Sequence, residues 1–253
     1  MGGVITQGDI NSKINNTMKK IVFLATVFSF LLVGCNTTKD DGEDKNNTVG
    51  MEDISLMFSG ISFTKAINNA SKSYSISDSC LIVDAGSGTN YFISPDGSRS
   101  ETTVPILLAE IDNLKPFTFT TRLRSDIEKE YDAGTVYIFI DNENWLKFAF
   151  ERDEKKRSRI VTVRTVNSSD DNNHDIIGQD YVYLRISSNG KQIGYYYSLD
   201  GVDWNLARIY RNEYPSTIWL GISSQSPKEG NNVAYFDEMS LTESYISHHR
   251  LGQ

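Results

Sequence analysis

Apolar and polar residues alternate along most of this chain after residue 50, and this pattern predicts β-strands rather than helices. The clearest example is the segment 145–152. Its apolar side consists of Leu146, Phe148 and Phe150. Its other side combines an aromatic ring, a cation and a carboxylate from Trp145, Lys147 and Glu151. The apolar side requires a core, and the opposite side has the composition of a ligand-binding or solvated face.

The same alternation, interrupted by Gly, Pro, Asn and Asp turn signals, predicts a long series of short strands. A weak helical pattern occurs only at 65–72. Many short strands without an alternating strand and helix rhythm indicate an all-β jelly-roll sandwich of two antiparallel sheets. The predicted strands are 54–64, 80–84, 90–94, 104–111, 117–124, 135–141, 145–152, 158–166, 181–187, 191–199, 205–210, 217–223 and 233–242.

Residues 1–35 are predicted to be a leader and a lipoprotein signal peptide. Lys19 and Lys20 form a basic start, and the apolar run 21–33 is shorter than the roughly 20 residues of a membrane-spanning helix. The run ends in Leu-Val-Gly-Cys, which resembles a bacterial lipobox, so Cys35 is expected to carry the lipid.

Residues 36–50 are polar and charged, which predicts a disordered acidic tether. Its segment 39–41, Lys-Asp-Asp, resembles the export signals of surface-exposed lipoproteins. We therefore expect an outer-membrane protein, anchored to the membrane by its N-terminal lipid and facing the cell surface, with the periplasmic face as the alternative. The folded domain is expected at 51–244, followed by a C-terminal tail at 245–253.

The charge of the chain argues against nucleic acid as a partner. It has 25 Lys and Arg against 33 Asp and Glu, a net charge of −8, and nucleic acids require clustered cations. If Cys35 is lipidated, only Cys80 is left, so no internal disulfide is expected and a buried thiol is the simplest interpretation.

Four segments resemble a known family in their order and spacing. They are 131–134 running into 143–147, 165–170, 197–204 followed by Arg208, and 221–227 followed by 236–237. Together they are similar to the domain-of-unknown-function 1349 family, also described as regulation-of-enolase-like. The resemblance implies a concanavalin A-like lectin or glucanase sandwich without an established activity. Related domains accompany enzymes that act on polysaccharides or act on glycans themselves.

No catalytic residue can be assigned from the sequence. A glucanase on this fold would need the pattern Glu-x-Asp-x-x-Glu, with two carboxyl groups about 5 Å apart. The two places that begin this pattern, at Glu110 and Glu151, both end in Lys instead of Glu. Zinc and serine nucleophile motifs are missing from the sequence as well. An enzyme would have to use Glu151 with Asp170 or Asp132.

Carbohydrate binding is the better hypothesis, because aromatic rings and planar polar groups are the side chains that hold sugars. The expected ligand-binding residues are Trp145, Lys147, Glu151, Arg164, Arg185, Tyr195 and Tyr197. The two tyrosines depend on the phase of their strand, because they become core residues if Tyr196 faces outward. No cofactor is expected, although a structural calcium ion near Asp237 is an alternative suggested by the resemblance.

The sequence therefore predicts a surface lipoprotein whose lectin-like sandwich binds an oligo- or polysaccharide for glycan capture or utilisation. Two alternatives stay open. One is a glycan-active enzyme similar to glycoside hydrolases, and the other is a protein-interaction module of a surface nutrient-uptake complex.

Overall fold

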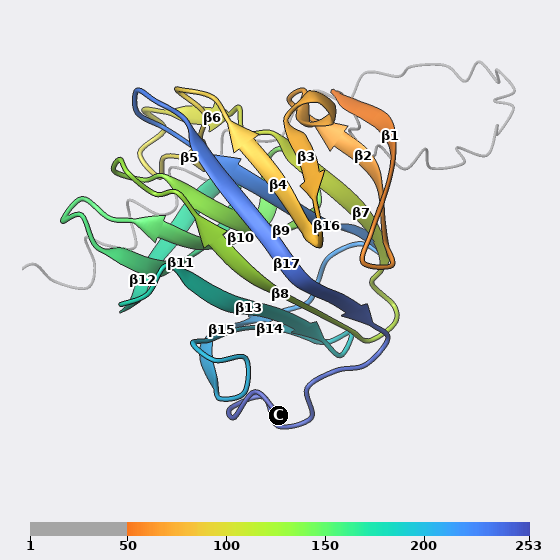
Figure 1. The fold of residues 1–253 in the computed structure, drawn as a ribbon. Coiled ribbons are helices and arrows are strands. Elements are labelled where there is room, and N and C mark those ends of the chain that lie inside the picture. The colour runs from red at the N-terminus through yellow and green to blue at the C-terminus, as the bar shows by residue number, and fades with distance from the viewer. Residues whose placement is uncertain (1–49) are drawn as a thin grey trace, which may run out of the picture. The chain divides into compact units, whose positions relative to one another are not determined.

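Two antiparallel β-sheets pack face to face in the computed structural model, which describes residues 50–253 (Figure 1). This arrangement confirms the predicted all-β sandwich. The leader, Cys35 and residues 36–49 of the tether lie outside the described residues. In the described part of the chain, no helix is long and apolar enough to cross a membrane.

Eight strands form one sheet and seven form the other, and a separate hairpin lies beside them. In spatial order, the eight-stranded sheet contains β1 (Met51–Phe58), β2 (Ile61–Ile67), β7 (Ile106–Asp112), β16 (Thr217–Gln225), β9 (Ala133–Phe139), β10 (Asn144–Arg152), β11 (Ser158–Val166) and β12 (Ser168–Ile176). The seven-stranded sheet contains β15 (Trp204–Arg211), β14 (Gln192–Ser198), β13 (Tyr181–Ser188), β8 (Phe117–Ser125), β17 (Asn232–Thr242), β4 (Cys80–Ala85) and β3 (Tyr74–Ser77). The hairpin is β5 (Tyr91–Ile93) with β6 (Ser100–Thr102).

The main core lies between the sheets and follows from the alternation of each strand. On β10, Leu146, Phe148 and Phe150 point inward and are fully buried. From the other sheet, Phe119 and Leu123 of β8 belong to the same apolar cluster. Burying large apolar side chains from both sheets is the main driving force for this fold, at about 1.5–3 kcal/mol for each fully buried side chain.

Two predictions for the first folded segment were wrong. The expected strand 54–64 is a hairpin of β1 and β2, because Ser59 and Gly60 both have positive φ angles, 50° and 77°, and reverse the chain. The weak helical pattern at 65–72 gives the end of β2 and a single 3-10 turn, Ala70–Lys72. Tertiary pairing with β7 therefore overrides the local helix propensity.

The hairpin of β5 and β6 covers part of the outer face of the eight-stranded sheet. Its Tyr91 is fully buried and makes edge contacts with Tyr137 and Trp145, with ring centroids 5.9 and 5.3 Å apart. The amide of Ile93 donates to Ser169 Oγ on β12 at 3.0 Å. A second apolar cluster thus forms outside the sandwich core and fixes the hairpin to the sheet.

The C-terminal tail, residues 245–253, lies against the outer face of the seven-stranded sheet. Arg185 Nη1 on β13 donates to the carbonyl of Gly252 at 3.2 Å. A Cβ atom on Gly252 would come within 2.7 Å of Trp204, so the tail approaches β15 closely at this glycine. This part of the outer face is therefore covered by the chain itself.

Candidate functional site

The strand register brings several polar side chains to one patch on the outer face of the eight-stranded sheet. Gln225 of β16 and Glu151 of β10 pair with the same residue of β9 and therefore lie in one row. Lys147 lies four residues before Glu151 on the same face of β10. Val163 of β11 pairs with Lys147 on one side and with Asp171 of β12 on the other.

These side chains line a cavity of about 330 Å³ next to the β5–β6 hairpin. Its aromatic walls are Phe92 of β5 and Tyr131, from the loop before β9. The polar rim is formed by Asn90, Arg99, Glu154, Asp171 and Asn173. A cavity of this size, with a few polar groups among apolar and aromatic walls, is typical of a small-ligand site.

A buried hydrogen-bond network forms the floor of the cavity. Lys147 Nζ donates to the carbonyl of Tyr91 at 3.0 Å and to Gln225 Oε1 at 3.1 Å. Gln225 Nε2 in turn donates to the carbonyl of Tyr131 at 2.7 Å and to Glu151 Oε2 at 3.4 Å. Lys147 is 2% exposed and Glu151 is 9% exposed, so both charged groups are largely removed from water.

Burial shifts the pKa values of both charged residues toward their neutral forms. It raises the pKa of Glu151 to about 7, an effect that the positive charge of Lys147 offsets in part and that Asp171 strengthens. Burial lowers the pKa of Lys147, against the attraction of Glu151. A carboxyl group that titrates near neutral pH in a cavity is a candidate for ligand binding or proton transfer.

The network leaves hydrogen-bonding capacity for a ligand. A lysine ammonium has three N–H donors, and Lys147 uses two of them within the protein. Gln225 contacts Oε2 of Glu151, and within residues 50–253 the other oxygen, Oε1, has no hydrogen-bond partner. A ligand hydroxyl could accept from Lys147 and donate to Glu151, since a hydroxyl does both.

The carboxylates expected to pair with Glu151 in an enzyme do not lie with it in the cavity. Asp170 is in register with Arg164, and it points to the opposite face of β12 from Asp171. Asp132 is fully buried, where it accepts hydrogen bonds from the Lys129 amide at 2.8 Å and Ser226 Oγ at 3.0 Å. Asp171 and Glu154 line the cavity instead.

The structure separates the predicted ligand-binding residues. Lys147 and Glu151 line the cavity, whereas Trp145, on the same face of β10, is fully buried beneath the hairpin. Tyr195 and Tyr197 belong to the core between the sheets, and Tyr195 stacks on Phe148 with ring centroids 4.8 Å apart. The strand phase is therefore the alternative one, which removes both tyrosines from the outer surface.

The two predicted arginines also lie away from the cavity. Arg164 is exposed on the face of β11 opposite to Val163. Arg185 belongs to the other sheet, where its guanidinium lies 3.5 Å from the ring centroid of Trp204. Of the proposed set, the cavity thus contains only Lys147 and Glu151.

Sequence reasoning missed several lining residues because distant segments contribute them. Gln225 and Tyr131 occur in the segments that carried the family resemblance, but the predicted strand 217–223 stops two residues before Gln225. Asp171 lies on β12, which is polar except for its last residue, Ile176, and was not predicted as a strand. The useful signal was the even spacing of Ser223 and Gln225, which places both on one face of an extended β16.

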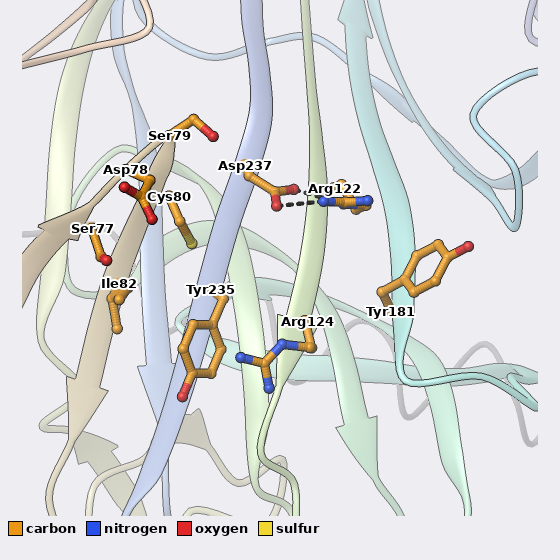
Figure 2. A pocket seen from close by; sticks show the side chains of 10 residues that line it. All are labelled: Ser77, Asp78, Ser79, Cys80, Ile82, Arg122, Arg124, Tyr181, Tyr235 and Asp237. Atoms are coloured by element: carbon orange, nitrogen blue, oxygen red, sulfur yellow. Dashed lines mark hydrogen bonds and ion pairs between the residues drawn. The ribbon is translucent and has the colours of Figure 1, made fainter.

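A second hollow, of about 530 Å³, lies on the outer face of the seven-stranded sheet (Figure 2). Both of its arginines already have partners within the protein. Arg122 donates from Nε and Nη2 to the two carboxylate oxygens of Asp237, at 2.8 and 2.6 Å, and Arg124 lies 3.6 Å from the ring centroid of Tyr235. Cys80, expected from the sequence to be buried, is only half-buried beside this hollow, and partial burial raises the pKa of its thiol. The cavity beside Glu151 is therefore the stronger candidate.

Asp237, considered above as a calcium ligand, is thus engaged by an arginine. Throughout residues 50–253, the structure contains no group of three or more His, Cys, Asp or Glu side chains that could hold a metal ion.

Comparison with known proteins identifies the family and the fold. The model of the family described as "Protein of unknown function (DUF1349)" matches residues 67–244. No curated protein matches the sequence significantly. A crystal structure of a functionally unknown protein from Saccharomyces cerevisiae is 21% identical, with a TM-score of 0.64, and the match covers 71% of this chain and 95% of that chain.

Similar folds also occur within larger GH43 proteins. The GH43 protein BlXynB of Bacillus licheniformis is 14% identical, with a TM-score of 0.57, over 80% of this chain and 40% of that chain. The xyloglucan PUL GH43B protein of Bacteroides ovatus is 12% identical, with a TM-score of 0.58, over 76% of this chain and 38% of that one. This chain therefore spans less than half of these two proteins, and the likeness concerns the fold.

Proposed function

The chain belongs to the DUF1349 family, whose function is unknown, and from the cavity on its eight-stranded sheet we propose that it binds carbohydrate. The observation that carries this proposal is the buried network of Lys147, Gln225 and Glu151 between two aromatic walls. Sugars present hydroxyl groups at their edges and C–H groups on their faces. The cavity offers fixed donors and acceptors for the hydroxyl groups and aromatic rings for the C–H faces.

Each part of the network has a distinct role in this proposal. Lys147 donates its remaining N–H to a sugar hydroxyl, and Glu151 Oε1 accepts the proton of that hydroxyl or of its neighbour. Gln225 holds both groups in position by bonding to each of them. Because the groups are buried and already oriented, little side-chain freedom is lost when the ligand binds.

The likeness to domains within GH43 proteins supports a role in carbohydrate metabolism, although it concerns the fold. The lipobox and the acidic tether support a location at the outer membrane, where Cys35 would anchor the domain to the lipid surface. In such a place, a binding domain would capture oligosaccharides or polysaccharides for uptake.

A glycan-active enzyme is the second candidate, and the pKa of Glu151 near 7 favours it, since a general acid or base works best with a pKa close to the operating pH. The variant Glu151→Gln separates the two functions when affinity and product formation are measured on the same oligosaccharides. If the protein is a binder, Glu151→Gln loses part of the affinity, and neither wild type nor the variant forms product. If the protein is an enzyme, wild type forms product and Glu151→Gln loses turnover.

A further inference from the structure

Tyr131 has an unusual backbone for its side chain. Its φ angle is +69°, in the left-handed region that glycine and asparagine adopt far more readily than an aromatic residue. Holding a tyrosine there costs conformational free energy, and such residues persist only where their surroundings fix them.

Hydrogen bonds on both sides of Tyr131 fix this conformation. Its amide donates to the carbonyl of Arg152 at 2.7 Å, and its own carbonyl accepts from Gln225 Nε2 at 2.7 Å. The next residue, Asp132, is fully buried and holds the loop through the Lys129 amide and Ser226 Oγ. The backbone of Tyr131 is therefore tied directly to the glutamine that joins Lys147 and Glu151.

The side chain of Tyr131 does not enter the core. It is 38% exposed and lines the cavity across from the buried network. Partial burial and the negative charges of Glu154, Glu130 and Glu151 raise the pKa of its hydroxyl. The exposed ring is not a core residue, and the turn alone would favour glycine or asparagine. Within the protein, Lys228 Nζ lies 5.7 Å from the ring centroid.

We propose that Tyr131 is the aromatic platform of the site, against which the apolar face of a pyranose ring stacks while its hydroxyls reach Lys147 and Glu151. This inference rests on the proposed function. It names the ligand class as a sugar ring with one face made of C–H groups. It also assigns the aromatic role to a loop residue, because Trp145 is covered by the β5–β6 hairpin.

The strain at Tyr131 allows a sharp test with the full chain. Tyr131→Phe keeps the ring, and Tyr131→Asn removes the ring while suiting the left-handed backbone. Affinity for a panel of neutral and acidic oligosaccharides is measured by titration calorimetry, and stability by urea unfolding. Tyr181→Asn, which removes a tyrosine with 36% exposure from the other sheet, is the matched control.

We expect Tyr131→Phe and Tyr181→Asn to bind within about twofold of wild type, and Tyr131→Asn to bind at least about tenfold more weakly. The urea midpoint of Tyr131→Asn should equal or exceed that of wild type. If wild type binds sugar and Tyr131→Asn binds it with unchanged affinity, the platform role is overturned and the proposed function stands. A clear loss of stability in that variant would show that the ring is structural. Failure of wild type to bind any sugar would remove the proposed function and this inference together.

Discussion

The ionisation of Glu151 should make the stability of this protein depend on pH in a way that Glu151→Gln removes. The carboxyl group is 9% exposed, and within residues 50–253 its hydrogen-bond partner is Gln225 Nε2 at 3.4 Å. Gln can accept the same hydrogen bond but cannot titrate. The difference in unfolding free energy between the two proteins therefore reports the ionisation of Glu151 together with its influence on the pKa of Lys147.

The magnitude follows from the shift in pKa. In the folded protein the pKa rises from 4.5 to about 7, which corresponds to about 3 kcal/mol at about 1.4 kcal/mol per tenfold change in proton affinity. The folded state keeps its proton over a range where the unfolded chain has lost it. The stabilisation is therefore complete below pH 4.5 and is lost as the pH rises through about 7.

Urea unfolding of both proteins between about pH 4 and pH 8.5 measures this difference directly. We expect the unfolding free energy of wild type, relative to Glu151→Gln, to fall by about 3 kcal/mol across this range, with most of the fall between the two pKa values. Curves that stay parallel throughout would refute the reasoning, because they would show that Glu151 has an ordinary pKa and is not desolvated.

Three further predictions concern the support of the site. Trp145→Ala should lower the unfolding free energy by about 3–5 kcal/mol, because the fully buried ring packs against Tyr91 and its removal leaves a cavity. Urea unfolding measures this loss, and a value below about 1 kcal/mol would contradict the prediction. Gly221→Ala should lower the unfolding free energy by about 1–3 kcal/mol in the same assay, since the new Cβ would lie 2.8 Å from Ile106 Cγ2 and 3.1 Å from Tyr137 Cβ. An unchanged urea midpoint would argue against this packing. Asp132→Ala should weaken sugar binding and destabilise the protein by about 1–3 kcal/mol, because the loop amides of Glu128 and Lys129 lose their acceptor. Calorimetry measures the affinity and urea unfolding the stability. A variant with wild-type affinity would show that the loop does not position Tyr131.

The sequence was sufficient to predict the sandwich because each strand carries its own pattern of burial. Segment 158–166 was predicted with the bounds that β11 has in the structure, since it is rich in β-branched Ile, Val and Thr residues. The polar strand β12 was missed because it lies at the edge of the sheet and has few apolar residues to mark one face. Its pairing with β11, rather than its composition, makes it a strand.

The site was harder to predict because it depends on which strands become neighbours. Lys147 and Glu151 could be placed on one face from their spacing alone. Gln225 joins them only because β16 pairs with β9 across about 90 residues of sequence. The triple tyrosine at 195–197 shows the opposite limit, because three consecutive rings fit either strand phase. Its phase is set by pairing with β13, where Tyr195 lies opposite Ile186 and Tyr197 opposite Leu184.

The central claim is that the cavity beside Glu151 binds sugar, and a glycan-array screen of wild type beside Lys147→Met tests it most directly. Methionine keeps an unbranched side chain but removes the donor at the cavity floor. Urea unfolding confirms that the variant is folded, and Tyr181→Ala, on the other sheet, is the control. We predict binding by wild type and by Tyr181→Ala, and its loss in Lys147→Met. Wild-type binding that Lys147→Met retains, or no binding to any glycan by a folded wild type, would contradict the account.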